Sequence, residues 1–134
     1  MLPFTLDTVR LSLHVLAATV WVGGQLTLAG LVPGLRALGD DVPRIVARRF
    51  ARIAWPAYAV LVATGIWHLV ELPVGDFGVE WQVTLLVKIT VVALAGMSAA
   101  IHAGARSTAV LAAFGALGGL TSVAAVVLGI MLHG

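Results

Sequence analysis

The chain has 134 residues, of which 60% are hydrophobic and 10% are charged. A soluble domain usually carries about 25% charged residues, so this sequence cannot cover a water-facing surface of ordinary polarity, and its hydrophobicity also excludes intrinsic disorder. The formal net charge is +2 and cysteine is absent, which excludes disulfides, thiolate metal sites, iron–sulfur clusters and a cysteine nucleophile.

Four apolar segments take up most of the length, and each is long enough to cross ~30 Å of hydrocarbon as a helix. We therefore expect an all-α fold, an integral membrane four-helix bundle forming one domain over residues 1–134. In chain order, the spans are expected at about 8–32, 45–71, 81–105 and 108–132. Pro33 and Gly34 are expected to end the first helix, and residues 44–52 to extend the second at its start.

The charges outside the spans predict an orientation. The arginines between the first and second spans are Arg36, Arg44, Arg48, Arg49 and Arg52. Arg106 lies between the third and fourth, whereas the connection between the second and third is acidic. The positive-inside rule puts the arginine-bearing connections in the cytoplasm and both termini outside. It also explains the pI of about 9.9 without nucleic acid. We expect a bacterial cytoplasmic membrane protein in contact with the lipid bilayer; a homodimer stays open.

At 100° per residue, the polar residues of each span fall on one face. These faces comprise Asp7, Arg10, His14, Trp21 and Gln25; then Thr64, His68 and Glu71; then Trp81, Thr84, Lys88 and His102; and finally Gly115, Gly119, Ser122, Gly129 and His133. Because a charge facing lipid is costly, the four faces are expected to meet inside the bundle. The glycines allow the fourth span to approach a neighbour closely.

Histidines are the candidate ligands of a cofactor. His14, His68 and His133 are expected in the outer half of the bundle, and imidazole suits copper and haem iron. We therefore take these three as candidate metal ligands, with copper or haem b as the cofactor. Trp21 shares the His14 face and is a candidate wall of a cofactor slot. The alternative for each histidine is a hydrogen bond inside the protein.

Lys88 is the single lysine of the chain. An unpaired lysine inside the membrane costs at least ~2.5–3.5 kcal/mol, so Lys88 is expected to lose its proton or to pair with a carboxylate. The candidate partners are Asp7, Glu71 and Glu80. A charged Lys88 would hold a haem propionate or an anionic substrate; the alternative is an ion-paired lysine that reaches the outer interface.

Three segments carry a family resemblance: LHVLAATVWVGGQLTLAGLVPGLR at 13–36, RFARIAWPAYAVLVATGIWHL at 49–69 and LLVKITVVALAG at 85–96. They resemble the membrane domain of copper-resistance protein D (CopD) and the related HemJ-type membrane proteins. The first resemblance implies copper handling across the cytoplasmic membrane. The second implies b-type haem and oxidation of protoporphyrinogen, with His14 and Lys88 as the functional residues. The chain lacks two features of the HemJ-type pattern: the aromatic- and arginine-rich stretch after the first motif, and the His, Trp and Cys residues late in the third span.

Our leading hypothesis is a CopD-like membrane protein that binds copper or haem iron for copper handling, uptake or electron transfer. One alternative is a haem-dependent membrane oxidoreductase acting on a porphyrin or quinol, and another is a non-catalytic accessory subunit. The sequence contains no phosphate-binding glycine loop, HExxH motif or suitably placed Ser–His–acid set, so we assign no catalytic residues and leave open whether the protein is an enzyme.

Overall fold

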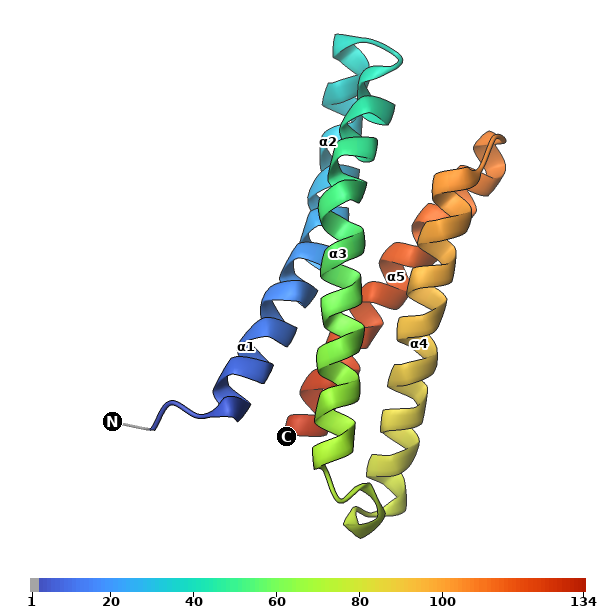
Figure 1. Ribbon diagram of the computed structural model, residues 1–134. Coiled ribbons are helices and arrows are strands. Elements are labelled where there is room, and N and C mark those ends of the chain that lie inside the picture. Colours follow the sequence, from blue (N-terminus) through green and yellow to red (C-terminus); the bar gives the residue numbers. More distant parts are fainter. Residues whose placement is uncertain (1–2) are drawn as a thin grey trace. The chain divides into compact units, whose positions relative to one another are not determined.

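A computed structural model describes residues 3–134 (Figure 1). The elements are α1 (Leu6–Ala18), the π-helical turn η1 (Thr19–Gly23), α2 (Gly24–Leu38), α3 (Val42–Glu71), the 3-10 turn η2 (Val74–Asp76), α4 (Val79–Gly104) and α5 (Thr108–His133). Because α1, η1 and α2 run on without a break, the described residues form four long helices and no strand. All four are long and apolar enough to cross a membrane, which confirms the predicted all-α fold with four spans.

Side-chain caps fix the start of the first and last helices. Thr5 precedes α1 and accepts a hydrogen bond from the Thr8 amide at 3.3 Å, while the Thr8 hydroxyl accepts one from the Thr5 amide. The Ser107 hydroxyl accepts a hydrogen bond from the Val110 amide at the start of α5. Both caps satisfy amides that have no partner within the first turn of a helix.

The predicted end of the first helix at Pro33 and Gly34 is wrong. The helix continues to Leu38 with Pro33 inside it, because proline has a helical φ and removes only one donor, a loss that membrane helices tolerate. The chain leaves the helix at Gly39, whose φ of 151° is a conformation that residues with a Cβ rarely adopt. Extension of the second helix over residues 44–52 is confirmed.

A π-helical turn interrupts the first span at Thr19–Gly23. Within it, Trp21 is buried, and its carbonyl accepts a hydrogen bond from the Gln25 side chain at 3.0 Å. A π turn adds a residue to the helical repeat, so it shifts the faces that precede and follow it relative to one another. Such turns occur frequently at functional sites, and the regular 100° spacing did not predict this one.

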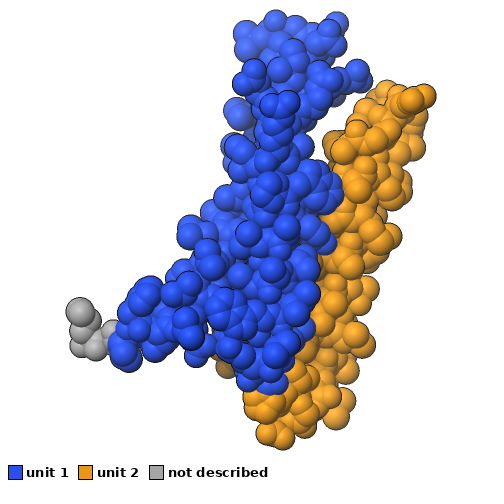
Figure 2. Space-filling view, in the orientation of Figure 1, with its two compact units in different colours: residues 1–72 blue, residues 73–134 orange. Residues whose placement is uncertain are grey.

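The chain divides after Leu72 into two compact units, coloured separately in Figure 2. In unit 1, α1 and α2 pack against α3; in unit 2, α4 packs against α5. The outward surfaces are apolar, with side chains such as Leu120 and Ile130 about 70% exposed. This distribution suits helices that contact lipid, because apolar side chains cost nothing there.

Small residues bring α4 and α5 together in unit 2. Ser98 and Ser122 are each 2% exposed, and Gly118 is also buried. A Cβ on Gly115 would lie 3.0 Å from the His102 ring, whereas a Cβ on Gly119 would meet no atom within 4 Å. The predicted close approach of the fourth span therefore involves Gly115, while Gly119 lies away from the contact.

We predict that Gly115→Ala destabilises the protein by about 1–3 kcal/mol, because the new methyl group overpacks against His102. Gly119→Ala is the matched control, and it should leave stability unchanged or raise it through better helix propensity. Thermal unfolding of both variants in the same detergent measures the difference. Equal melting temperatures would contradict the close contact at Gly115.

Candidate functional site

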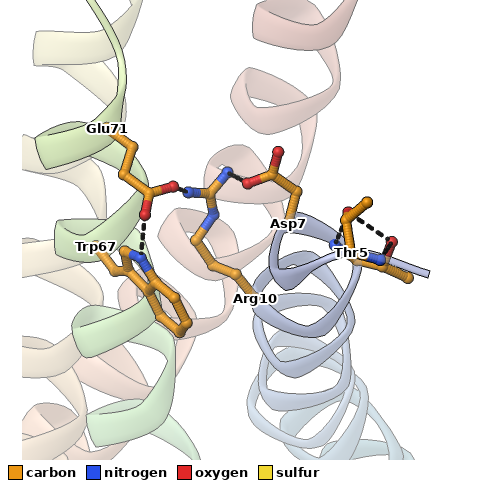
Figure 3. Close-up of polar contacts among 6 residues, drawn as sticks. Thr5, Asp7, Arg10, Trp67 and Glu71 are labelled. Atoms are coloured by element: carbon orange, nitrogen blue, oxygen red, sulfur yellow. Dashed lines mark hydrogen bonds and ion pairs between the residues drawn. The ribbon is translucent and has the colours of Figure 1, made fainter. Parts of the chain in front are cut away.

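Arg10 forms the centre of a polar cluster between α1 and α3 (Figure 3). Its Nη1 donates to a Glu71 carboxylate oxygen, and its Nη2 lies 3.0 Å from Asp7 Oδ1. The second Glu71 oxygen accepts a hydrogen bond from Trp67 Nε1 at 2.7 Å. Arg10 is 7% exposed, so this guanidinium is a buried charge neutralised by two carboxylates.

Sequence reasoning placed Arg10 on the polar face but gave it no role. The signal was a basic residue near the N-terminal end of one span and an acidic residue near the C-terminal end of the next, on adjacent antiparallel segments. Opposite charges at such positions lie at the same depth and can pair across the helices. Arg10 Nε is also buried, and no hydrogen-bond partner for it is found among residues 3–134.

His14 lies one turn after Arg10 and contacts Thr64 on α3. The distance from His14 Nδ1 to Thr64 Oγ1 is 2.9 Å. The ring also lies close to Gly65, where a Cβ would be in ordinary van der Waals contact with His14 Cε1 at 3.7 Å. The polar faces predicted for the first two spans therefore do meet, through the Arg10–Glu71 and His14–Thr64 contacts.

The Thr64 hydroxyl determines which His14 nitrogen carries the proton. Thr64 Oγ1 lies 2.7 Å from the Val60 carbonyl oxygen, which can only accept. The hydroxyl has one proton, and we assign it to that bond; its oxygen then accepts from His14 Nδ1–H. In this tautomer the lone pair of the imidazole is on Nε2.

The remaining candidates of unit 1 are His68 and Trp21. His68 follows Thr64 by one turn on the same face of α3 and is half-buried. Trp21 is 3% exposed and packs against two aromatic residues of α3, with ring centroids 5.4 Å from Trp55 and 4.6 Å from Tyr58. This contact explains the burial of Trp21; its role as a wall of a cofactor slot stays a prediction.

In unit 2, the predicted faces of the third and fourth spans also meet. A Cβ on Gly129 would lie 3.2 Å from Lys88 Nζ, so Lys88 lies along the glycine surface of α5. His102 Nδ1 donates to the Leu111 carbonyl at 2.7 Å, and Trp81 Nε1 donates to the Leu132 carbonyl at 3.2 Å. Backbone carbonyls and glycines of α5 thus receive the polar side chains of α4.

The expected carboxylate partner of Lys88 is not found within unit 2, where no acidic oxygen lies within 4 Å of its Nζ among residues 73–134. Of the three candidates, Asp7 and Glu71 bind Arg10 in unit 1. Glu80 is exposed at the start of α4.

His133 lies at the end of α5, where its Nδ1 donates to the Gly129 carbonyl at 2.8 Å. His14 and His68 belong to unit 1 and His133 to unit 2, so the convergence of all three on one ion stays a prediction. Over residues 3–134, no three His, Asp or Glu side chains are grouped closely enough to hold a metal ion.

In unit 1, an open apolar groove of about 250 Å³ also lies between α3 and the segment formed by α1 and η1. Its lining residues are Leu13, Leu16, Ala17, Val20, Pro56, Ala57 and Val60. The predicted site residues do not line this groove, and its apolar walls suit a lipid chain.

Comparisons with family models, curated proteins and solved structures gave no match to this chain. The resemblance to CopD and HemJ-type proteins therefore stays a prediction, carried by the three segments that suggested it.

We predict that Glu71→Gln destabilises the protein by about 1–3 kcal/mol, because it removes the charge that Arg10 Nη1 contacts. The half exposure of Glu71 keeps the cost below the ~3–5 kcal/mol of a fully buried pair. Glu80→Gln, at an exposed carboxylate, is the matched control and should have little effect. Denaturant titration of both in detergent tests this, and equal stabilities would show that the Arg10–Glu71 pair contributes nothing.

Proposed function

We propose that this protein is a CopD-like integral membrane protein that binds a transition metal through His14, and that the metal is the iron of b-type haem. The observation that carries the proposal is the hydrogen bond between His14 Nδ1 and Thr64 Oγ1. It holds the imidazole in one orientation, and in the tautomer assigned above the lone pair is on Nε2, the atom that we propose as the ligand.

This arrangement is the one that metal-ligating histidines usually have. Such a histidine donates its other ring N–H to an acceptor, which fixes the tautomer and raises the basicity of the ligating nitrogen. Thr64 is itself held by the Val60 carbonyl. The support for His14 therefore extends through two hydrogen bonds into the backbone of α3.

Haem fits this geometry better than copper. Haem iron needs one or two axial ligands, and histidine is the usual one. A copper site built from imidazoles needs two or three of them close together. A single oriented imidazole meets the minimum for haem, and His68, one turn from Thr64 on the same face, is the candidate for a second ligand.

A haem held inside a bilayer supports electron transfer, and we propose this role ahead of copper uptake. The haem-dependent oxidoreductase acting on a porphyrin or quinol is the second candidate, favoured by Lys88, whose amino group lies against Gly129 on the glycine face of α5. The accessory-subunit alternative is retained for a protein that binds neither haem nor copper.

We predict that detergent-purified protein has a Soret band and that His14→Ala abolishes it, because the axial ligand is lost. Thr64→Val should weaken haem binding by about tenfold, since the ring loses its orienting hydrogen bond. Thr64→Ser retains the hydroxyl and is the matched control, with a spectrum close to that of the original protein.

Metal analysis of the same samples separates the candidates. A colourless protein that contains stoichiometric copper would show that the bound metal is copper and not the iron of haem. A Soret band that persists in His14→Ala would show that His14 is not the ligand of the haem iron. A sample with neither pigment nor copper would leave the accessory-subunit alternative.

We also propose that both termini face outward. The arginines at the α2–α3 end of unit 1 are exposed, and among the described residues none of them has an ion-pair partner. A face of this kind attracts anionic headgroups of the cytoplasmic leaflet. The connection at Val74–Asp76 then lies on the opposite side of the membrane.

Because the chain has no cysteine, single cysteines can report this orientation. We predict that a membrane-impermeant maleimide labels Gly75→Cys in intact cells and labels Asp40→Cys only after the membrane is opened. Both positions are exposed, so labelling of both after permeabilisation is the internal control. The reverse pattern would invert the proposed topology.

A further inference from the structure

Among residues 3–134, one nitrogen of the Arg10 guanidinium, Nε, is buried without a hydrogen-bond partner. The Arg10 side chain is 9% exposed. Buried donors in native proteins nearly always have a partner. An unmatched guanidinium N–H is therefore a sign of a binding group that is absent from the isolated chain.

The two carboxylates around Arg10 are held unequally (Figure 3). Glu71 accepts from Arg10 Nη1 and from Trp67 Nε1, so both of its oxygens are engaged. Asp7 contacts Arg10 through one oxygen, at 3.0 Å, and its side chain is 73% exposed. Asp7 is thus the carboxylate that a competing anion displaces at the lower cost.

The Asp7 contact also uses only half of a two-donor edge. Nε–H and Nη2–H lie on the same edge of a guanidinium and point in parallel, which matches the two oxygens of a carboxylate. Asp7 Oδ1 takes Nη2 alone, and Nε is left over. A carboxylate that bound this edge with both oxygens would satisfy the donor that Asp7 leaves unmatched.

We infer that the Nε and Nη2 edge of Arg10 binds a carboxylate of the ligand in place of Asp7. The inference rests on the proposed function, in which the ligand is haem b and the carboxylate is a propionate. Arg10 and His14 lie one turn apart on one face of α1, ~6 Å along the helix axis. One ligand can therefore contact both, with its metal at His14 and its acidic edge toward Arg10.

The experiment compares haem b with its dimethyl ester, in which both propionates are neutral. Each is titrated into the detergent-purified full chain, and the Soret band gives the dissociation constant. The protein should bind haem b about tenfold or more tightly than the ester, because charge-assisted hydrogen bonds are lost in the ester. Release to an excess of a haem-scavenging globin gives the dissociation rates independently.

Three variants assign the discrimination to Arg10. Arg10→Gln should bind both compounds alike, with the Soret maximum unchanged because His14 is retained. Asp7→Asn should bind haem b several-fold more tightly, since the competing carboxylate is neutralised, and should leave ester binding unchanged. Lys88→Gln, which removes the other candidate cation, should keep the discrimination.

Equal affinity of the unaltered protein for haem b and its ester would overturn the inference and leave haem binding intact. A preference for haem b over its ester that persists in Arg10→Gln and disappears in Lys88→Gln would show that Lys88, not Arg10, binds the carboxylate. If a lipid phosphate fills the Arg10 edge instead, haem and ester would again bind alike. Failure to bind either compound would overturn the proposed function together with this inference. If Arg10→Gln fails to fold, the same titrations of Arg10→Lys and Asp7→Asn distinguish between these outcomes.

Discussion

Polar side chains inside apolar helices need hydrogen-bond or ion-pair partners, and this constraint organises both units, because several of those partners come from the neighbouring helix. In unit 1, Arg10 meets Glu71 and His14 meets Thr64. In unit 2, the ring of His102 meets the Leu111 carbonyl. With lipid on the outside there is no water to satisfy these groups, so the acceptors on the partner helix must lie at the right depth, and these contacts hold the antiparallel register.

The two units satisfy that constraint with different chemistry. Unit 1 pairs side chain with side chain, and it contains the buried charge Arg10. Unit 2 pairs long polar side chains of α4 with backbone carbonyls and glycines of α5, as at Gly115 and Gly129. A glycine surface receives a side chain but does not orient it with a second polar group. Contacts in which side chains of two helices orient one another, as His14 and Thr64 do, are therefore found in unit 1.

Hydropathy and the 100° periodicity predicted the four spans and the facing polar stripes, because both depend on how costly a polar group is in lipid. They mislocated the end of the first helix, since a proline removes one backbone donor and need not end a helix in which neighbouring groups compensate for that loss. They missed the π turn at Thr19–Gly23 because a regular spacing cannot reveal an added residue. The pairing of individual residues could not be predicted from the sequence either. Arg10 and Glu71 are 61 positions apart, and only the register of the folded helices brings them together.

A buried arginine with two acidic neighbours has an obvious structural explanation, namely that the carboxylates neutralise it. That explanation accounts for Glu71, which is fixed by two donors, but not for the arrangement on the other edge of the guanidinium. Neutralisation alone would favour an aspartate that used both Nε and Nη2, because a bidentate contact is the stronger one. Asp7 instead makes one exposed contact, and within residues 3–134 the buried Nε donor has no partner. Neutralisation of Arg10 therefore explains the Glu71 contact, whereas a ligand carboxylate on the Nε and Nη2 edge would explain the other side of the guanidinium.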